Sequence, residues 1–168
     1  MKFQIFQILK KLNLKKNIFV ILVYGAILDS KGVEKLLEIY KYKFRDIHCL
    51  IVGKQFDNTK KFLTNNRFVK SLKKNKNISI YNGWQSEKKE AIFFSAADAI
   101  WIGYKNYSFP SGVLYQAVSL KKPSILSNEA GFINDLNNKF KIGEACNIDD
   151  PLDILNAIKK IRKPKYLF

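Results

Sequence analysis

Short apolar runs alternate with longer amphipathic stretches along most of the chain. The runs are rich in β-branched and aromatic residues, and the clearest of them are IFVILVY at 18–24 and HCLIV at 48–52. Runs of this kind are typical of strands that are buried on both faces of a parallel sheet. Six such strands are expected, at residues 18–24, 48–52, 78–81, 99–102, 124–126 and 143–146.

The stretches between the runs carry apolar residues at helical spacing. Asn58 or Thr59 is expected to cap a single helix that continues to about Lys74, and Asp150 with Pro151 should start the last helix. The inward face of that last helix should carry Leu152, Leu155, Ile158 and Ile161. Strands and helices that alternate in this order predict an α/β fold: a doubly wound, mostly parallel six-stranded sheet with helices on both faces.

The stretch from Ser108 to Pro123 carries a Pro-Ser-Gly turn between an expected strand and an expected helix. The free backbone N–H groups at the start of that helix, from Ser111, Gly112 and Val113, are placed to point at a phosphate. A turn and helix cap with no ligand would have the same sequence, so the motif needs support from elsewhere in the chain.

That support comes from a resemblance to the group-1 glycosyltransferases, the retaining family with the two-domain GT-B fold. Its nucleotide-sugar site carries a Glu, seven residues and a second Glu, followed by Ala and a Pro-led strand. Here Ser108 takes the position of the first Glu and Gln116 that of the second. The family's Gly-Arg, four residues and Lys-Gly after the first strand appears as GAILDSKG, in which Lys31 is kept and Ala26 replaces the Arg.

The resemblance runs from about residue 18 to residue 161 and implies one Rossmann-like half of a GT-B fold, the C-terminal donor domain. It implies that Lys31 binds the donor diphosphate, that Gln116 bonds the ribose and that Trp84 stacks on the base. The expected donor site is Gly25, Lys31, Trp84, Ser108, Ser111, Gly112, Val113 and Gln116. These residues follow the carboxyl ends of expected strands, where ligands of such sheets bind. No residue is assigned a catalytic role, and no cofactor or metal is expected.

The 168 residues carry a formal net charge of +16, mostly as Lys spread along the whole chain. Charge alone would support nucleic-acid binding, but no stripe of basic residues forms, so no nucleic-acid partner is expected. Cys49 and Cys146 lie in apolar runs and are expected to be free, buried and cytosolic. His48, the one histidine, has no visible metal or triad partner and is expected to be structural.

Residues 1–17 form a basic amphipathic leader before the donor-binding domain of residues 18–168. Ile5, Ile8, Leu9 and Leu12 share a helical face with Lys on its flanks. The leader fits two roles, an interfacial helix on an anionic membrane or a helix packed on its own domain. The chain is therefore expected to be cytoplasmic, with the inner membrane surface as one partner under the first role.

Two functions remain open. The first is a donor domain that binds a nucleotide-diphospho-sugar and supports glycosyl transfer in cell-surface polysaccharide or lipid-linked glycan synthesis. Because only about 17 residues precede the first strand, that function is expected to need an acceptor domain absent from this chain, which leaves a fragment, a split enzyme completed in trans and a decayed relative as alternatives. The alternative is a non-catalytic, degenerate glycosyltransferase-like binding or scaffold domain, which the loss of both acids and of the Arg favours.

Overall fold

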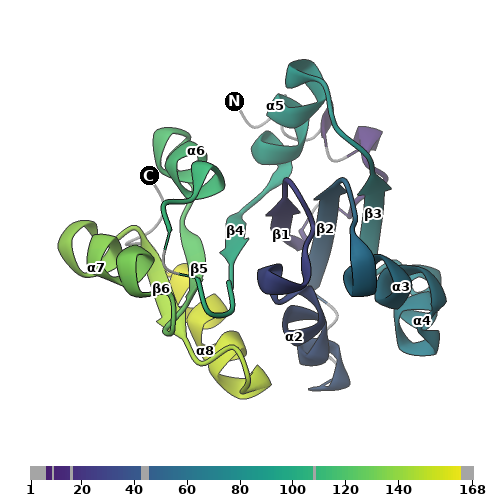
Figure 1. Ribbon diagram of the computed structural model, residues 1–168. Coiled ribbons are helices and arrows are strands. Elements are labelled where there is room, and N and C mark those ends of the chain that lie inside the picture. The colour runs from purple at the N-terminus through teal and green to yellow at the C-terminus, as the bar shows by residue number, and fades with distance from the viewer. Residues whose placement is uncertain (1–6, 9, 16, 43–45, 108, 164–168) are drawn as a thin grey trace.

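The computed structural model describes residues 7–8, 10–15, 17–42, 46–107 and 109–163. Its centre is a six-stranded sheet in the order β3-β2-β1-β4-β5-β6, in which every neighbouring pair is parallel (Figure 1). The strands are β1 (Phe19–Tyr24), β2 (Ile47–Gly53), β3 (Ile78–Asn82), β4 (Ala99–Ile102), β5 (Ser124–Ser127) and β6 (Gly143–Cys146). The expected doubly wound α/β fold is confirmed.

The strand order locates the point where a ligand would bind. The chain builds β1, β2 and β3 outward in one direction and then returns to place β4 on the other side of β1. At such a reversal the loops after the two central strands diverge and leave a crevice at their carboxyl ends. The loops that follow β1 and β4 therefore form the edge on which a site is expected.

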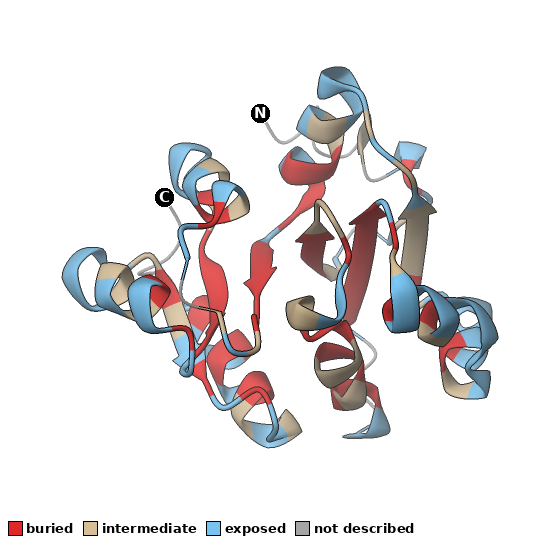
Figure 2. Ribbon diagram, viewed as in Figure 1, coloured by how far each residue is buried: buried red, intermediate tan, exposed pale blue. Residues whose placement is uncertain are grey.

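Helices cover both faces of the sheet (Figure 2). One face packs on α2 (Val33–Leu37), the 3-10 helix η2 (Glu38–Tyr42), α3 (Asp57–Asn65), α4 (Arg67–Lys74) and α8 (Pro151–Ile161). The other packs on α5 (Glu87–Ala96), α6 (Gly112–Ser119) and α7 (Gly131–Phe140).

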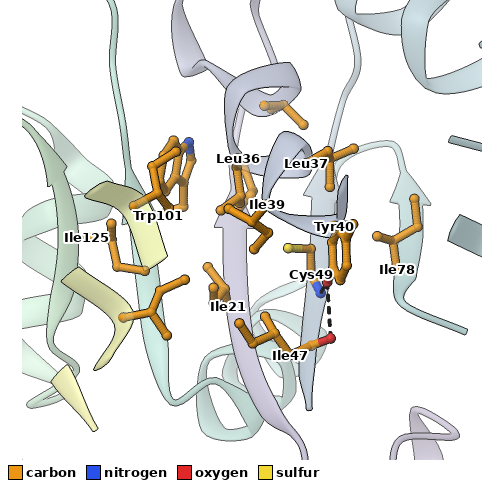
Figure 3. Packing of buried hydrophobic residues seen from close by; sticks show 14 of the residues in the cluster. Ile21, Leu36, Leu37, Ile39, Tyr40, Ile47, Cys49, Ile78, Trp101 and Ile125 are labelled. Carbon is orange, nitrogen blue, oxygen red and sulfur yellow. Dashed lines mark hydrogen bonds between the residues drawn. The ribbon is translucent and has the colours of Figure 1, made fainter. Parts of the chain in front are cut away.

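The side chains of β1 alternate between two apolar clusters, one on each side of the sheet. Ile21 and Val23 belong to the first cluster, which Figure 3 shows around Leu36 and Trp101, whereas Val20 and Leu22 belong to the second. A strand buried on both faces has no polar position, and this explains the continuous apolar run in the sequence.

The described part of the leader packs on the second cluster. Leu12 is buried there, and Ile8 and Leu14 are half-buried against it. These contacts are those of a helix that covers its own domain, although Ile5 and Leu9 lie outside the described residues. No helix in the described ranges is long and apolar enough to cross a bilayer.

Three expectations about helices are wrong. Asn58 and Thr59 do not cap α3, because the helix begins at Asp57 and both side chains donate to the Asp29 carboxylate, at 3.0 Å and 2.6 Å. The single helix expected up to Lys74 is two helices, because Asn66 is extended and its side chain accepts bonds from the N–H groups of Phe68 (2.9 Å) and Val69 (3.3 Å), which start α4. In α8, Leu152 is half exposed, and Ile154 takes the inward position. Asp150 does cap α8, as expected, through the Leu152 N–H (2.9 Å).

Candidate functional site

The loop after β1 and the loop after β4 are held against each other by their backbones. Gly32 has a left-handed backbone (φ +59°), and a Cβ there would lie 2.4 Å from the carbonyl oxygen of Gly103. The indole Nε1 of Trp101 donates to the carbonyl oxygen of Lys31 at 2.7 Å. The backbone N–H of Lys105 donates to the carbonyl oxygen of Ser30 at 2.8 Å. These contacts fix the short 3-10 helix η1 (Asp29–Lys31) beside the start of the β4–α6 loop.

The Lys31 side chain crosses this junction. Its Nζ donates to the Tyr104 hydroxyl at 2.7 Å and to the Tyr24 carbonyl oxygen at 3.2 Å, and it lies 4.4 Å from the centroid of the Tyr104 ring. Burial lowers the pKa of Lys31 to about 8, because water no longer solvates the ammonium fully. Burial likewise raises the pKa of Tyr104 to about 12, so this hydroxyl stays protonated.

Lys31 pairs with no carboxylate among the described residues, although other lysines do. Lys105 pairs with Glu34, and Lys35 pairs with Asp149. A half-buried ammonium usually has an anionic partner, since desolvation of an unpaired charge is costly. The position of Lys31 is therefore that of a cation available to an anionic ligand.

The start of α6 lies next to this ammonium. A Cβ built on Gly25 would lie 3.9 Å from Lys31 Nζ and 3.6 Å from Val113 Cγ2, so both residues border the same glycine. Ser111 caps the helix, because its hydroxyl accepts the Leu114 N–H (3.3 Å) and lies 3.1 Å from the Tyr104 hydroxyl. The N–H groups of Gly112 and Val113 have no acceptor among the described residues, as is usual in the first turn of a helix, so they are free to donate to an anion.

A carboxylate that the sequence did not indicate completes the cluster. Glu90, on α5, accepts hydrogen bonds from the Tyr24 hydroxyl and from the Gln116 amide nitrogen. Burial raises the pKa of Tyr24, and its bond to Glu90 acts in the same direction. Gln116 lies one helical turn after Gly112, so its partner Glu90 lies on the side of α6 that carries Gly112.

The expected site residues are thus only partly brought together. Gly25, Lys31, Ser111, Gly112, Val113 and Gln116 lie around the junction of β1, β4 and α6. Trp84 follows β3, which β2 separates from β1, and it is 67% exposed. Ser108 lies outside the described residues.

Sequence reasoning missed Tyr24, Glu90 and Tyr104, which contact the expected residues only through the tertiary fold. His48 lies elsewhere, at the start of β2. Its Nδ1 donates to the Lys76 carbonyl oxygen at 3.0 Å, so Nε2 accepts from the Ser79 hydroxyl at 3.0 Å, and burial lowers its pKa. No group of three His, Cys, Asp or Glu side chains that could hold a metal ion occurs within the described ranges.

Solved structures with the same fold include glycosyltransferases. Anabaena Alr3699/HepE in complex with UDP and glucose aligns with a TM-score of 0.74 and 16% identity, over 96% of this chain and 43% of that one. WaaG, a glycosyltransferase involved in lipopolysaccharide biosynthesis, aligns at 0.70 and 16%, over 95% and 42%. The chain therefore spans about two fifths of the length of these proteins.

A solved C-terminal domain matches nearly end to end. The C-terminal domain of a glycosyl transferase group 1 family protein (LpcC) from Francisella tularensis aligns with a TM-score of 0.60 and 19% identity, over 93% of this chain and 84% of that one. No curated protein matches the sequence. The family model "Glycosyl transferases group 1" matches residues 4–165, nearly the whole chain. The chain belongs to the group 1 glycosyltransferase family.

Proposed function

We propose that this chain is the donor-binding domain of a glycosyltransferase and that it binds a nucleoside diphosphate sugar at the junction of β1, β4 and α6. The observation that carries the proposal is Lys31, a half-buried ammonium without a carboxylate partner in the described structure, beside the free N–H groups of α6. A diphosphate supplies the negative charge that both features favour.

The proposed diphosphate lies between Lys31 and the N–H groups of Gly112 and Val113. Gly25 carries no side chain, so a ligand can approach the backbone closely at the end of β1. The Alr3699/HepE structures, which share this fold, contain UDP, and one of them also contains glucose. These complexes make UDP the first ligand to test.

Glu90 is proposed to accept hydrogen bonds from the hydroxyl groups of the ribose. Gln116 stands where the resemblance places a Glu, but its amide N–H already donates a hydrogen bond to Glu90. The carboxylate has more acceptor capacity than the two bonds use, because each oxygen offers two lone pairs. The pair of Glu90 and Gln116 therefore presents a negative acceptor one turn along α6 from the diphosphate.

Glycosyl transfer needs a second domain in this proposal. Alr3699/HepE and WaaG are more than twice as long as this chain, and the described residues contain one Rossmann-like sheet. We propose that an acceptor-binding domain covers the carboxyl edge of the sheet and that the product is a cell-surface polysaccharide or a lipid-linked glycan.

Calorimetric titration with UDP and GDP tests the donor site. UDP should bind, and Lys31→Ala should weaken binding about tenfold or more, since a hydrogen bond from a charged group contributes roughly 1.5–3 kcal/mol. Lys35→Ala is the matched control, because it removes the same charge from a lysine that is paired with Asp149. No heat at millimolar nucleotide would leave the scaffold function as the better explanation.

The ribose contact is tested by a variant and a ligand together. Glu90→Gln should weaken UDP binding about tenfold and should leave binding of 2′,3′-dideoxy-UDP unchanged, because the lost partner is a diol hydroxyl. Equal weakening for both ligands would show that Glu90 supports the fold of the site and does not contact the ribose.

A further inference from the structure

An apolar pocket lies between α6 and α7, away from the donor site. It measures about 460 Å³, within the range of small-molecule sites, and its walls are mostly aliphatic and aromatic. Tyr115 (52% exposed), Val118 (45%) and Phe140 (59%) line it and present apolar surface to water. Exposed apolar residues are ordinary one at a time, but a group around one hollow indicates a binding surface.

Three lysines border the same pocket, and none of the described residues that line it is acidic. Lys121 and Lys141 are exposed, and each has the left-handed backbone that ends its helix (φ +54° and +52°), a position that usually takes glycine. Neither pairs with a carboxylate in the described part of the chain. Lys122 is half-buried and donates from Nζ to the Ala97 carbonyl oxygen at 2.6 Å.

An apolar hollow with a cationic rim matches an amphiphile that carries a negative head. The pocket is too small to hold the several turns of a partner helix, whose anchors spread over successive turns. The apolar wall suits an acyl chain, and the exposed ammonium groups of Lys121 and Lys141 supply the positive charge that a phosphate requires.

The leader competes for this role, but its apolar face is already used. Leu12 is buried in the second cluster, and Ile8 and Leu14 pack against that cluster. The described leader therefore offers a membrane mainly its lysines, whereas the pocket offers apolar surface and charge together.

We infer that the pocket between α6 and α7 binds an anionic phospholipid of a membrane surface. The bound lipid holds the α6–α7 side of the domain on the bilayer. The cationic rim lies past the C-terminal ends of the two helices, whereas the donor site lies at the N-terminal end of α6, so both sites can be occupied at once.

Vesicle sedimentation tests the inference with the full chain. The protein should bind vesicles of phosphatidylcholine with phosphatidylglycerol and should not bind phosphatidylcholine alone. Lys121→Gln/Lys141→Gln should weaken binding about tenfold or more, since each basic residue near an anionic surface adds to the attraction. Phe140→Ser should weaken it by a similar factor through lost apolar contact.

Matched variants separate the pocket from general charge and from the leader. Lys10→Gln/Lys11→Gln removes two exposed leader lysines, and Phe109→Ser removes an exposed phenylalanine just before the N-terminal end of α6, away from the lysines at its C-terminal end. Both should bind nearly as the wild type does, with unchanged melting temperatures throughout. Equal weakening in the two lysine pairs, or weakening in the leader pair alone, would overturn the inference, as would absence of binding to the anionic vesicles.

Cross-linking locates the bound lipid. Phosphatidylglycerol with a diazirine in its acyl chain should mark peptides that contain Tyr115, Val118 or Phe140. Marks confined to residues 1–17 would assign the membrane contact to the leader and overturn the inference. UDP binding is independent of this result, so failure here leaves the donor-site proposal intact.

Discussion

Lys31 has contacts that favour ligand binding more than stability. Its ammonium bonds to one hydroxyl and one carbonyl oxygen, and burial lowers its pKa to about 8. The unfolded chain would hold the same proton with a pKa near 10.5. Folding therefore works against the charged form of Lys31, and a bound anion would offset that cost.

This cost predicts a pH-dependent difference between the wild type and Lys31→Met. Between the folded pKa of about 8 and the unfolded value of 10.5, the unfolded chain binds a proton that the folded chain has released, so stability rises with pH. Between pH 7 and pH 10, the melting temperature of the wild type should rise relative to that of Lys31→Met. The expected rise is about 3–5 °C for each unit by which the folded and unfolded pKa values differ. Thermal unfolding at several pH values measures it.

Lys35→Met provides a control with the opposite sign. The hydrogen bond with Asp149 raises the pKa of Lys35 above its ordinary value, so its contribution to stability is lost as pH rises through the folded pKa. That loss falls above pH 10.5, so the wild type should not gain on Lys35→Met between pH 7 and pH 10, and any difference should be small because exposed ion pairs contribute little. The same trend in both variants would contradict the assigned environment of Lys31.

The sequence predicts the site residues that lie directly after a strand or directly before a helix. Gly25 and Lys31 follow a recognisable strand, and Ser111 to Val113 precede a recognisable helix, so each could be placed beforehand. Glu90 could not, because it sits in a polar stretch of charged residues, and only the packing of α5 brings it to Tyr24 and Gln116. Tyr104 is likewise defined by a contact with a loop 73 residues away.

The contact between η1 and the β4–α6 loop requires a glycine at position 32. Gly32 ends η1 with a left-handed backbone and lies against the backbone of Gly103. This close approach holds η1 next to the β4–α6 loop. The position of Lys31 beside Tyr104 follows from this close approach.

Gly32→Ala should destabilise the fold and displace Lys31. A Cβ at 2.4 Å from a backbone oxygen cannot be relieved by a side-chain rotation, and the left-handed conformation adds strain. We expect a loss of about 2 kcal/mol or more, which corresponds to about 4–8 °C in melting temperature. Gly131→Ala is the control, since a Cβ there meets nothing within 4 Å, and equal losses would contradict the packing argument.

Strands were easier to predict than helix limits for a physical reason. A strand buried on both faces excludes polar residues along its whole length, and this leaves a clear run such as 18–24. The break between α3 and α4 depends on one extended residue, Asn66, within a polar stretch whose apolar spacing continues on both sides. The pair Asn65-Asn66 was the only local signal of that break.

The sheet couples the site to the stability of the whole domain. The two apolar clusters share the strands of one sheet, so a domain of this size is expected to unfold as a cooperative unit. A ligand that binds only the folded chain then shifts the entire transition, although it contacts only the edge where β1, β4 and α6 meet.

UDP should therefore raise the melting temperature, and its diphosphate should cause most of the effect. At a free concentration about 100-fold above Kd, one bound ligand adds about 2.7 kcal/mol, or roughly 5–10 °C for a chain of this length. Uridine at the same concentration lacks the groups that Lys31 and the N–H groups of α6 would bind, so its shift should be small. Lys31→Ala should lose most of the UDP shift, whereas Lys35→Ala should keep it. Equal shifts with UDP and uridine would show that the base and ribose carry recognition and that the diphosphate is not held at Lys31.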